Sequence, residues 1–253
     1  LRDRLVGDDP SARPPVADDL QAKGRDYLRQ MAAACRDWIG PPATEVKNYE
    51  YRFRLGDEAP QVQRIDDPQR AAAPIRQGIT YFGTPHALAS RPEKVVFRQV
   101  EAGHETILLR FLLQDSVKIA AGNGIVGRWR GYFSTPLREG LIVLDKTNCR
   151  PVRTEVGGVR ETFSQYVDLG NGRFAPLAIR IEQGATGWDW KFHVYQPGLW
   201  LVAESRNHAA DAGGERLVTV DEVKVNGGQA VLMRAGEAPT RRDPPVDGKG
   251  LGR

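Results

Sequence analysis

Residues 188–195 read Trp-Asp-Trp-Lys-Phe-His-Val-Tyr, in which Trp188, Trp190, Phe192 and Val194 alternate strictly with the other four side chains. Successive side chains of a β-strand point to opposite faces of a sheet, so four large apolar groups would project from one face. A strict period of two over eight residues is typical of a strand with one buried face. This stretch therefore predicts a strand whose aromatic side faces a core.

Stretches with the same period lie on both sides of it along the chain. Residues 168–172 and 225–228 contain Asn and Gly, which accept positive φ at little cost and are typical of hairpin turns. Short strands joined by turns, with no helices between them, predict an antiparallel meander. The predicted strands are 48–55, 78–82, 94–100, 106–113, 125–133, 141–144, 152–156, 159–169, 174–183, 188–195, 199–205 and 217–225.

A single long amphipathic helix is predicted at about residues 19–39. Asp18 or Asp19 supplies an N-cap oxygen, and Gly40 followed by two prolines ends the helix. If fully buried, each large apolar residue on its face would contribute roughly 1.5–3 kcal/mol, so the helix has to lie on an apolar surface. The residues of that face are Leu20, Tyr27, Leu28, Met31, Cys35, Trp38 and Ile39.

These elements predict an α+β fold that is mainly antiparallel β. A sheet of this size must close or be covered, so we expect a large curved sheet or an unclosed β-barrel covered by the long N-terminal helix. One domain is expected at 19–233, after an extended leader at 1–18 and before a Pro- and Gly-rich tail at 234–253. The segment 57–77 is predicted as either a long loop or a second short helix.

Composition excludes some classes of function. The net charge of +4 is dispersed along the chain without a basic patch, so no nucleic-acid partner is expected. No apolar run approaches the roughly 20 residues of a membrane span, and the start of the given chain does not resemble a signal peptide. Cys35 and Cys149 could form a disulfide in an oxidising compartment or be two buried free thiols.

Motifs for catalysis are weak. The four histidines, at positions 86, 104, 193 and 208, have no metal-ligand spacing, and neither a hydrolase elbow nor a phosphate-binding loop is present. No metal and no cofactor are therefore expected.

A pair of carboxylates leaves one enzymatic alternative open. Glu155 and Glu161 lie on neighbouring predicted strands, and Asp189 lies among tryptophans, a mixture that glycosidases use. The simpler interpretation is that strand carboxylates are solvated or paired with Arg153 and Arg160. We favour that interpretation and predict a protein that binds rather than catalyses.

Large apolar side chains expected to point into the curved sheet are the candidates for a binding site. They could simply pack the core. Alternatively, one helix cannot fill so wide a concave surface, and the remaining space is an apolar cavity with an aromatic lip at 197–200. The candidates are Tyr51, Phe53, Leu109, Phe111, Trp129, Phe133, Phe163, Trp188, Trp190 and Phe192.

The order of these elements resembles the lipoprotein-carrier (LolA/LolB-type) superfamily of bacterial envelope proteins. A helix ends near Trp38-Ile39, and a first strand follows at residues 46–53. Residues 141–155 are similar to that family's strand, aspartate turn and return strand with proline, valine and arginine. Residues 166–179 are similar to its hairpin with tyrosine, glycine, proline and isoleucine, and residues 220–226 to its closing strand.

The resemblance implies an unclosed barrel, lined with apolar residues and lidded by helices, that binds a lipid or the acyl chain of a lipoprotein. It implies a hydrophobic small molecule or an acylated protein as partner, with a possible envelope protein partner, in the periplasm or secreted. Two alternatives remain. One is a structural or partner-binding domain of a larger envelope assembly, and the other is a carbohydrate-binding module or glycosidase.

Overall fold

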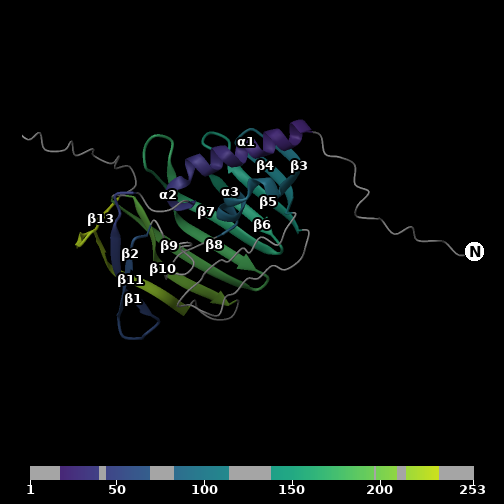
Figure 1. Cartoon of the computed structure of the whole chain (residues 1–253). Helices are drawn as coiled ribbons and strands as arrows, with labels where there is room; N and C mark the ends of the chain where they lie inside the picture. The colour runs from purple at the N-terminus through teal and green to yellow at the C-terminus, as the bar shows by residue number, and fades with distance from the viewer. Residues whose placement is uncertain are drawn as a thin grey trace, which may run out of the picture.

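The computed structural model describes residues 18–39, 44–68, 83–113, 138–196, 198–209 and 215–233. They form an antiparallel sheet with a helix across it, which confirms the predicted fold class (Figure 1). The helices are α1 Asp18–Ala34, α2 Arg36–Ile39, α3 Thr84–Ser90 and the 3-10 turn η2 Pro92–Lys94. The strands are β1 Asn48–Leu55, β2 Gln61–Asp66, β3 Val95–Ala102, β4 Thr106–Leu113, β5 Arg138–Asp145, β6 Pro151–Val156, β7 Val159–Asp168, β8 Phe174–Gln183, β9 Thr186–Gln196, β10 Leu199–Ala209, β11 Glu215–Val225, β12 Gly228–Gln229 and β13 Val231–Leu232.

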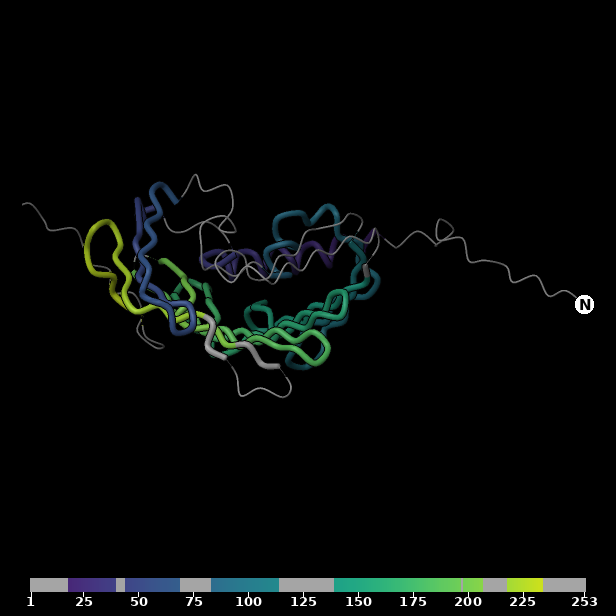
Figure 2. The backbone as a smooth tube through the Cα atoms, turned by 90° about the horizontal axis from the view of Figure 1, so that it is seen from below, coloured from purple at the N-terminus to yellow at the C-terminus, as the bar shows by residue number. Residues whose placement is uncertain are grey.

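The strands form one unclosed sheet. Its order is β2-β1-β11-β10-β9-β8-β7-β6-β5-β4-β3, with β12 paired to β11 and β13 paired to β9. The predicted meander is thus present from β3 to β11, and the first hairpin joins its far side. Figure 2 shows the sheet bent into an open curve with α1 lying inside it. We call the side of the sheet that faces α1 the concave face, and the other side the convex face.

Hairpin turns lie where Asn and Gly predicted them. Gly170 and Asn171 between β7 and β8 have φ of 79° and 56°. Asn226 after β11 has φ of 52°, and its side chain also ties the start of β1 to this turn. The amide N–H of Lys47 donates to Asn226 Oδ1 at 2.7 Å, and Asn226 Nδ2 donates to the Glu45 carbonyl oxygen at 2.7 Å.

The docking of α1 explains how the sheet is covered at one edge. The side-chain amide of Gln21 donates to the Phe97 carbonyl oxygen at 2.8 Å and accepts from the Phe97 N–H at 2.9 Å. It therefore satisfies backbone groups of the edge strand β3 that no neighbouring strand reaches. A Cβ at Gly24 would lie 2.3 Å from Phe97 Cγ, so only glycine permits this approach.

Among the described helices, none is long and apolar enough to cross a membrane.

Three elements differ from the sequence-based expectation. Residues 61–66, expected in a loop or a short helix, form β2. Their sequence has no alternating apolar pattern, so the strand is stabilised by its antiparallel pairing with β1. The short helix α3 was not predicted, since seven residues carry little periodicity. The predicted helix 19–39 is divided at Cys35, although Cys35 N–H still donates to the Met31 carbonyl oxygen at 2.9 Å. The predicted strands 78–82 and 125–133 lie outside the described residues.

Candidate functional site

The concave face of the central strands is almost entirely apolar. Directly opposite residues on β7 to β11 form one row across it, and none of them is more than 5% exposed. Ser205 is the one polar member of this row. The row consists of Phe163, Ile179, Trp190, Ser205 and Val218.

Aromatic rings continue from this row to the covering helix α2. The ring centroids of Trp190 and Phe192 are 6.3 Å apart, and those of Phe192 and Trp200 are 3.9 Å apart with planes at 10°. Trp38 of α2 lies 5.6 Å from Trp200 and 5.7 Å from Phe163. We call these five residues, Trp38, Phe163, Trp190, Phe192 and Trp200, the aromatic wall. It joins a covering helix to three strands of the sheet.

Some of the predicted site residues belong to the aromatic wall. Phe163, Trp190 and Phe192 are members, and Trp188 follows on the same side of β9, where it is only partly buried. Trp200, expected as a lip at a rim, is instead buried in the wall, because its indole faces inward and donates to the Pro176 carbonyl oxygen at 2.9 Å. Trp129 and Phe133 lie outside the described residues.

The remaining candidates lie toward the two ends of the sheet. Tyr51 and Phe53 on β1 have ring centroids 5.6 Å apart, and Tyr51 Oη donates to Gln63 Oε1 at 2.6 Å. Leu109 and Phe111 on β4 are fully buried. A Cβ on the opposing glycine of β5 would lie 2.4 Å from Phe111 Cζ. These residues share the hydrophobic core with the wall, but the sheet order separates them from it.

Three buried polar atoms of the wall and its row stand out. Trp38 Nε1, Trp190 Nε1 and Ser205 Oγ have no hydrogen-bond partner within the part of the chain that the structure describes. Most buried polar groups in folded proteins are paired, because an unpaired one costs about 1–3 kcal/mol. Two of the three, Trp190 and Ser205, are direct cross-strand neighbours.

Sequence alternation alone misplaces Ser205. Counting inward positions from Trp200 and Val202 would turn Glu204 toward the core. The register shifts between Val202 and Glu204, however, so that Glu204 pairs with Lys191 and Ser205 lies opposite Trp190. A β-bulge of this kind inserts one residue and reverses the faces that follow. The bulge is therefore the signal that sequence reasoning lacked.

The short helix α3 is held over the wall by two buried polar contacts. Glu161 on the concave side of β7 is 0% exposed and accepts from the Thr84 N–H at 3.1 Å and from the Thr154 hydroxyl. His86 Nε2 lies 2.7 Å from the Trp38 carbonyl oxygen. Burial lowers the pKa of His86 to about 4, against a smaller opposing effect of that hydrogen bond. The contacts connect β7, α3 and α2.

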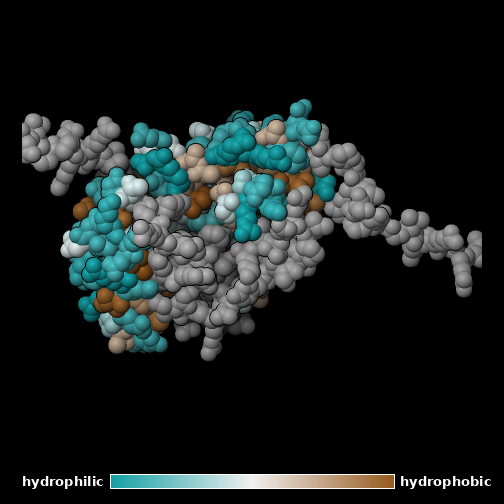
Figure 3. Space-filling view, in the orientation of Figure 1, coloured by the Kyte–Doolittle hydropathy of each residue, from teal (hydrophilic) through white to brown (hydrophobic). Residues whose placement is uncertain are grey.

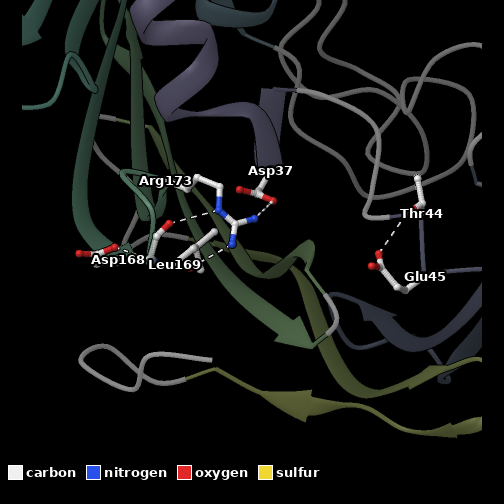
Figure 4. A network of polar contacts seen from close by, with 7 residues as sticks. Asp37, Thr44, Glu45, Asp168, Leu169 and Arg173 are labelled. Atoms are coloured by element: carbon white, nitrogen blue, oxygen red, sulfur yellow. Dashed lines mark hydrogen bonds and ion pairs between the residues drawn. The ribbon is translucent and has the colours of Figure 1, made fainter. Parts of the chain in front are cut away.

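Helix α2 is also attached to the β7–β8 hairpin. Arg173 Nη1 lies 3.2 Å from Asp37 Oδ1, and the same guanidinium donates to the carbonyl oxygens of Leu169 and Gly170, each at 3.2 Å (Figure 4). Both side chains of the ion pair are mostly buried.

Figure 3 shows hydrophilic residues over the outer surface of α1 and hydrophobic residues gathered beneath it, toward the sheet.

The carboxylates considered for glycoside hydrolysis do not share a cleft. Glu155 points to the convex face, where Arg160 Nε lies 3.0 Å and Arg153 Nε 3.4 Å from its Oε1, as the simpler interpretation predicts. Glu161 points to the concave face and is bound by Thr84 and Thr154, so its predicted solvation or arginine pairing is wrong. Asp189 pairs with an arginine of β8 at 3.3 Å.

A surface depression of about 500 Å³ lies on the convex face of β4 to β8. Directly opposite residues line its floor across five strands. Arginine and glutamate alternate there around one leucine, so the charges largely compensate each other and the surface offers little to an apolar ligand. This row consists of Arg110, Leu141, Glu155, Arg160 and Glu182.

The described residues form neither a metal site nor a disulfide. Among the described residues, no group of three or more His, Cys, Asp or Glu side chains could hold a metal ion. Cys35 and Cys149 are both buried free thiols, and Cys149 Sγ donates to Gln30 Oε1 at 3.2 Å.

No protein family, curated protein or solved structure matches the chain. The resemblance to lipoprotein carriers therefore stays a prediction.

Proposed function

We propose that this protein binds an apolar, lipid-like ligand against its aromatic wall, without catalysing a reaction. The observation that carries the proposal is the continuous run of rings from Trp38 on α2 to Trp190 on β9, with the partly buried Trp188 beyond it. Such rings offer a large apolar area to an acyl chain. Each Å² of apolar surface that the ligand and the wall bury together contributes roughly 25 cal/mol.

The way in which α2 and α3, together called the cover, are attached supports access of a ligand to the aromatic wall. Helix α2 has four residues and α3 has seven, so each packs only a few apolar side chains on the core, chiefly Trp38 of α2 and Leu88 of α3. Polar contacts such as His86 with Trp38 and Arg173 with Asp37 attach them. Contacts of this kind contribute about 0.5–3 kcal/mol each, which ligand burial can offset when the cover moves.

The bacterial cell envelope is the proposed setting. The support is the resemblance of Trp38-Ile39 and of residues 46–53, 141–155, 166–179 and 220–226 to lipoprotein carriers. A free lipid or the acyl chain of a lipoprotein would then be the ligand, and the periplasm the compartment.

Two variants of β9 test the proposal. Trp188→Ala removes an aromatic side chain from the concave side, and Tyr195→Ala removes one from the convex side of the same strand. Delipidated protein is mixed with a long-chain acyl lipid, and binding is measured by native mass spectrometry. We expect Trp188→Ala to weaken binding about tenfold and Tyr195→Ala to leave it unchanged. Equal binding by all three proteins, or none by the wild type, contradicts the proposal.

A second candidate is a partner-binding domain of an envelope assembly. Val62 on the edge strand β2 is 63% exposed, and Val231 on β13 is 59% exposed. An edge strand with an exposed apolar residue can accept a strand from another chain. If this function holds, Val62→Lys abolishes cross-linking to an envelope partner while acyl-lipid binding is unchanged.

A further inference from the structure

Trp190 and Ser205 form a buried polar pair inside an apolar row. They lie directly opposite each other on β9 and β10, and the pair is flanked by Ile179 and Val218. Trp190 is 5% exposed and Ser205 is 0% exposed. Neither Trp190 Nε1 nor Ser205 Oγ has a hydrogen-bond partner among the residues that the structure describes.

Two other buried polar groups on the concave face are satisfied within the protein. Trp200 Nε1 donates to the Pro176 carbonyl oxygen at 2.9 Å, and the Thr154 hydroxyl donates to Glu161. The fold thus supplies partners for these two buried polar groups, as folded proteins do for most such groups. Two directly opposite residues whose polar atoms are both left without one indicate a place for a polar atom that the described residues do not provide.

The chemistry of the two groups selects the atom that would fit. An indole N–H can only donate, whereas a serine hydroxyl can donate or accept. A carbonyl oxygen has two lone pairs and can accept from both groups at once. The charged side chains of Lys191, Glu204 and Arg206 belong to the opposite face of β9 and β10. Since no cation on these two described strands faces the pair, an uncharged carbonyl fits better than a carboxylate.

We infer that Trp190 Nε1 and Ser205 Oγ bind the carbonyl oxygen of an uncharged ester or amide, whose acyl chain lies along the aromatic wall. This inference rests on the proposed function and names its ligand class. The rings of Phe192 and Trp200 continue from Trp190 toward Trp38, so they supply an apolar surface for the chain next to the carbonyl. The pair thereby fixes where the carbonyl of the ligand lies along the apolar surface of the aromatic wall.

Three ligands of equal chain length test the inference: methyl laurate, laurate and an alkane, each presented from cyclodextrin and measured by calorimetry. The wild type is expected to bind the ester about fivefold more tightly than either the alkane or laurate, the ratio that one or two net hydrogen bonds give. Ser205→Ala is expected to remove the preference for the ester over the alkane and to leave alkane binding unchanged. Ser164→Ala, on the exposed side of β7, is the matched control and keeps the preference.

The outcomes separate the inference from the proposed function. If the wild type binds ester and alkane equally, or if Ser205→Ala weakens both equally, the inference is overturned while apolar binding stands. If the wild type binds neither ligand, both are overturned.

A spectroscopic measurement keeps the inference testable should Ser205→Ala fail to fold. The indole ¹H–¹⁵N resonance of Trp190, assigned through Trp190→Phe, is expected to move downfield when methyl laurate binds and to move less with the alkane. An equal shift with both ligands overturns the carbonyl contact.

Discussion

His86 Nε2 lies 2.7 Å from the Trp38 carbonyl oxygen, and this contact ties α3 to α2 over the aromatic wall. The ring of His86 also meets that of Trp38 edge-on, with centroids 5.4 Å apart. Because the imidazole is 3% exposed, its charged form is strongly disfavoured in the folded protein. The attachment of the cover is therefore coupled to pH.

Acid is expected to destabilise the protein through His86. Burial lowers its folded pKa to about 4, whereas the unfolded value is about 6.5. Between these values only the unfolded chain binds the proton, so stability falls as the pH falls, by up to about 3 kcal/mol. Urea unfolding from pH 7.5 to 4 is expected to show a shallower slope for His86→Gln than for the wild type. His104→Gln, an exposed control, keeps the wild-type slope, and identical slopes for all three would contradict the assignment.

Removing the Ser205 hydroxyl is expected to raise the stability of the ligand-free protein. The hydroxyl is buried without a described partner, a state that costs about 1–3 kcal/mol. Ser205→Ala should therefore increase the free energy of unfolding by about 1 kcal/mol, measured by chemical denaturation after delipidation. A loss of more than about 1 kcal/mol would mean that the hydroxyl has a structural partner.

Arg173 is expected to stabilise the cover measurably. Its guanidinium bonds Asp37 and two backbone carbonyls, with side-chain exposures of 24% for Arg173 and 13% for Asp37. Arg173→Met keeps most of the aliphatic stem and is expected to cost about 1–2 kcal/mol in thermal unfolding. Arg64→Met breaks an ion pair whose side chains are 60% and 72% exposed and should cost less than about 0.5 kcal/mol. Equal losses of stability in Arg173→Met and Arg64→Met would contradict this prediction.

Gly24 is expected to be intolerant of a side chain, although it lies in a helix. Alanine usually stabilises a helix by about 1 kcal/mol over glycine, yet a Cβ at Gly24 would lie 2.3 Å from Phe97 Cγ. Gly24→Ala should therefore lower the free energy of unfolding by about 1–3 kcal/mol. Phe97→Leu should recover part of the loss in a double-mutant cycle. Greater stability of Gly24→Ala alone would show that α1 does not approach β3 this closely.

Much of the fold follows from sequence periodicity. Trp188, Trp190 and Phe192 alternate with polar residues and do lie on one side of β9, since a period of two requires it. The apolar stripe of the first helix likewise buries Leu28 and Met31. These patterns are local, so the sequence displays them directly.

The parts that sequence reasoning missed depend on distant contacts. Glu161 is buried because Thr84, which lies 77 positions earlier, brings its N–H to the carboxylate. Ser205 faces inward because a bulge reverses the alternation of β10. Strand β2 buries only Ile65 and exists through its pairing with β1. None of these relationships leaves a periodic trace in the sequence.

The central claim is that an acyl chain contacts the aromatic wall, and brominated ligands test it directly, because bromine quenches indole fluorescence only at short range. Delipidated protein would be titrated with a methyl ester that carries bromine on its acyl chain, and tryptophan emission recorded. The account predicts saturable quenching at micromolar ligand, reduced in Trp188→Ala and retained in Tyr195→Ala. Unchanged emission up to the solubility limit of the ester would contradict it.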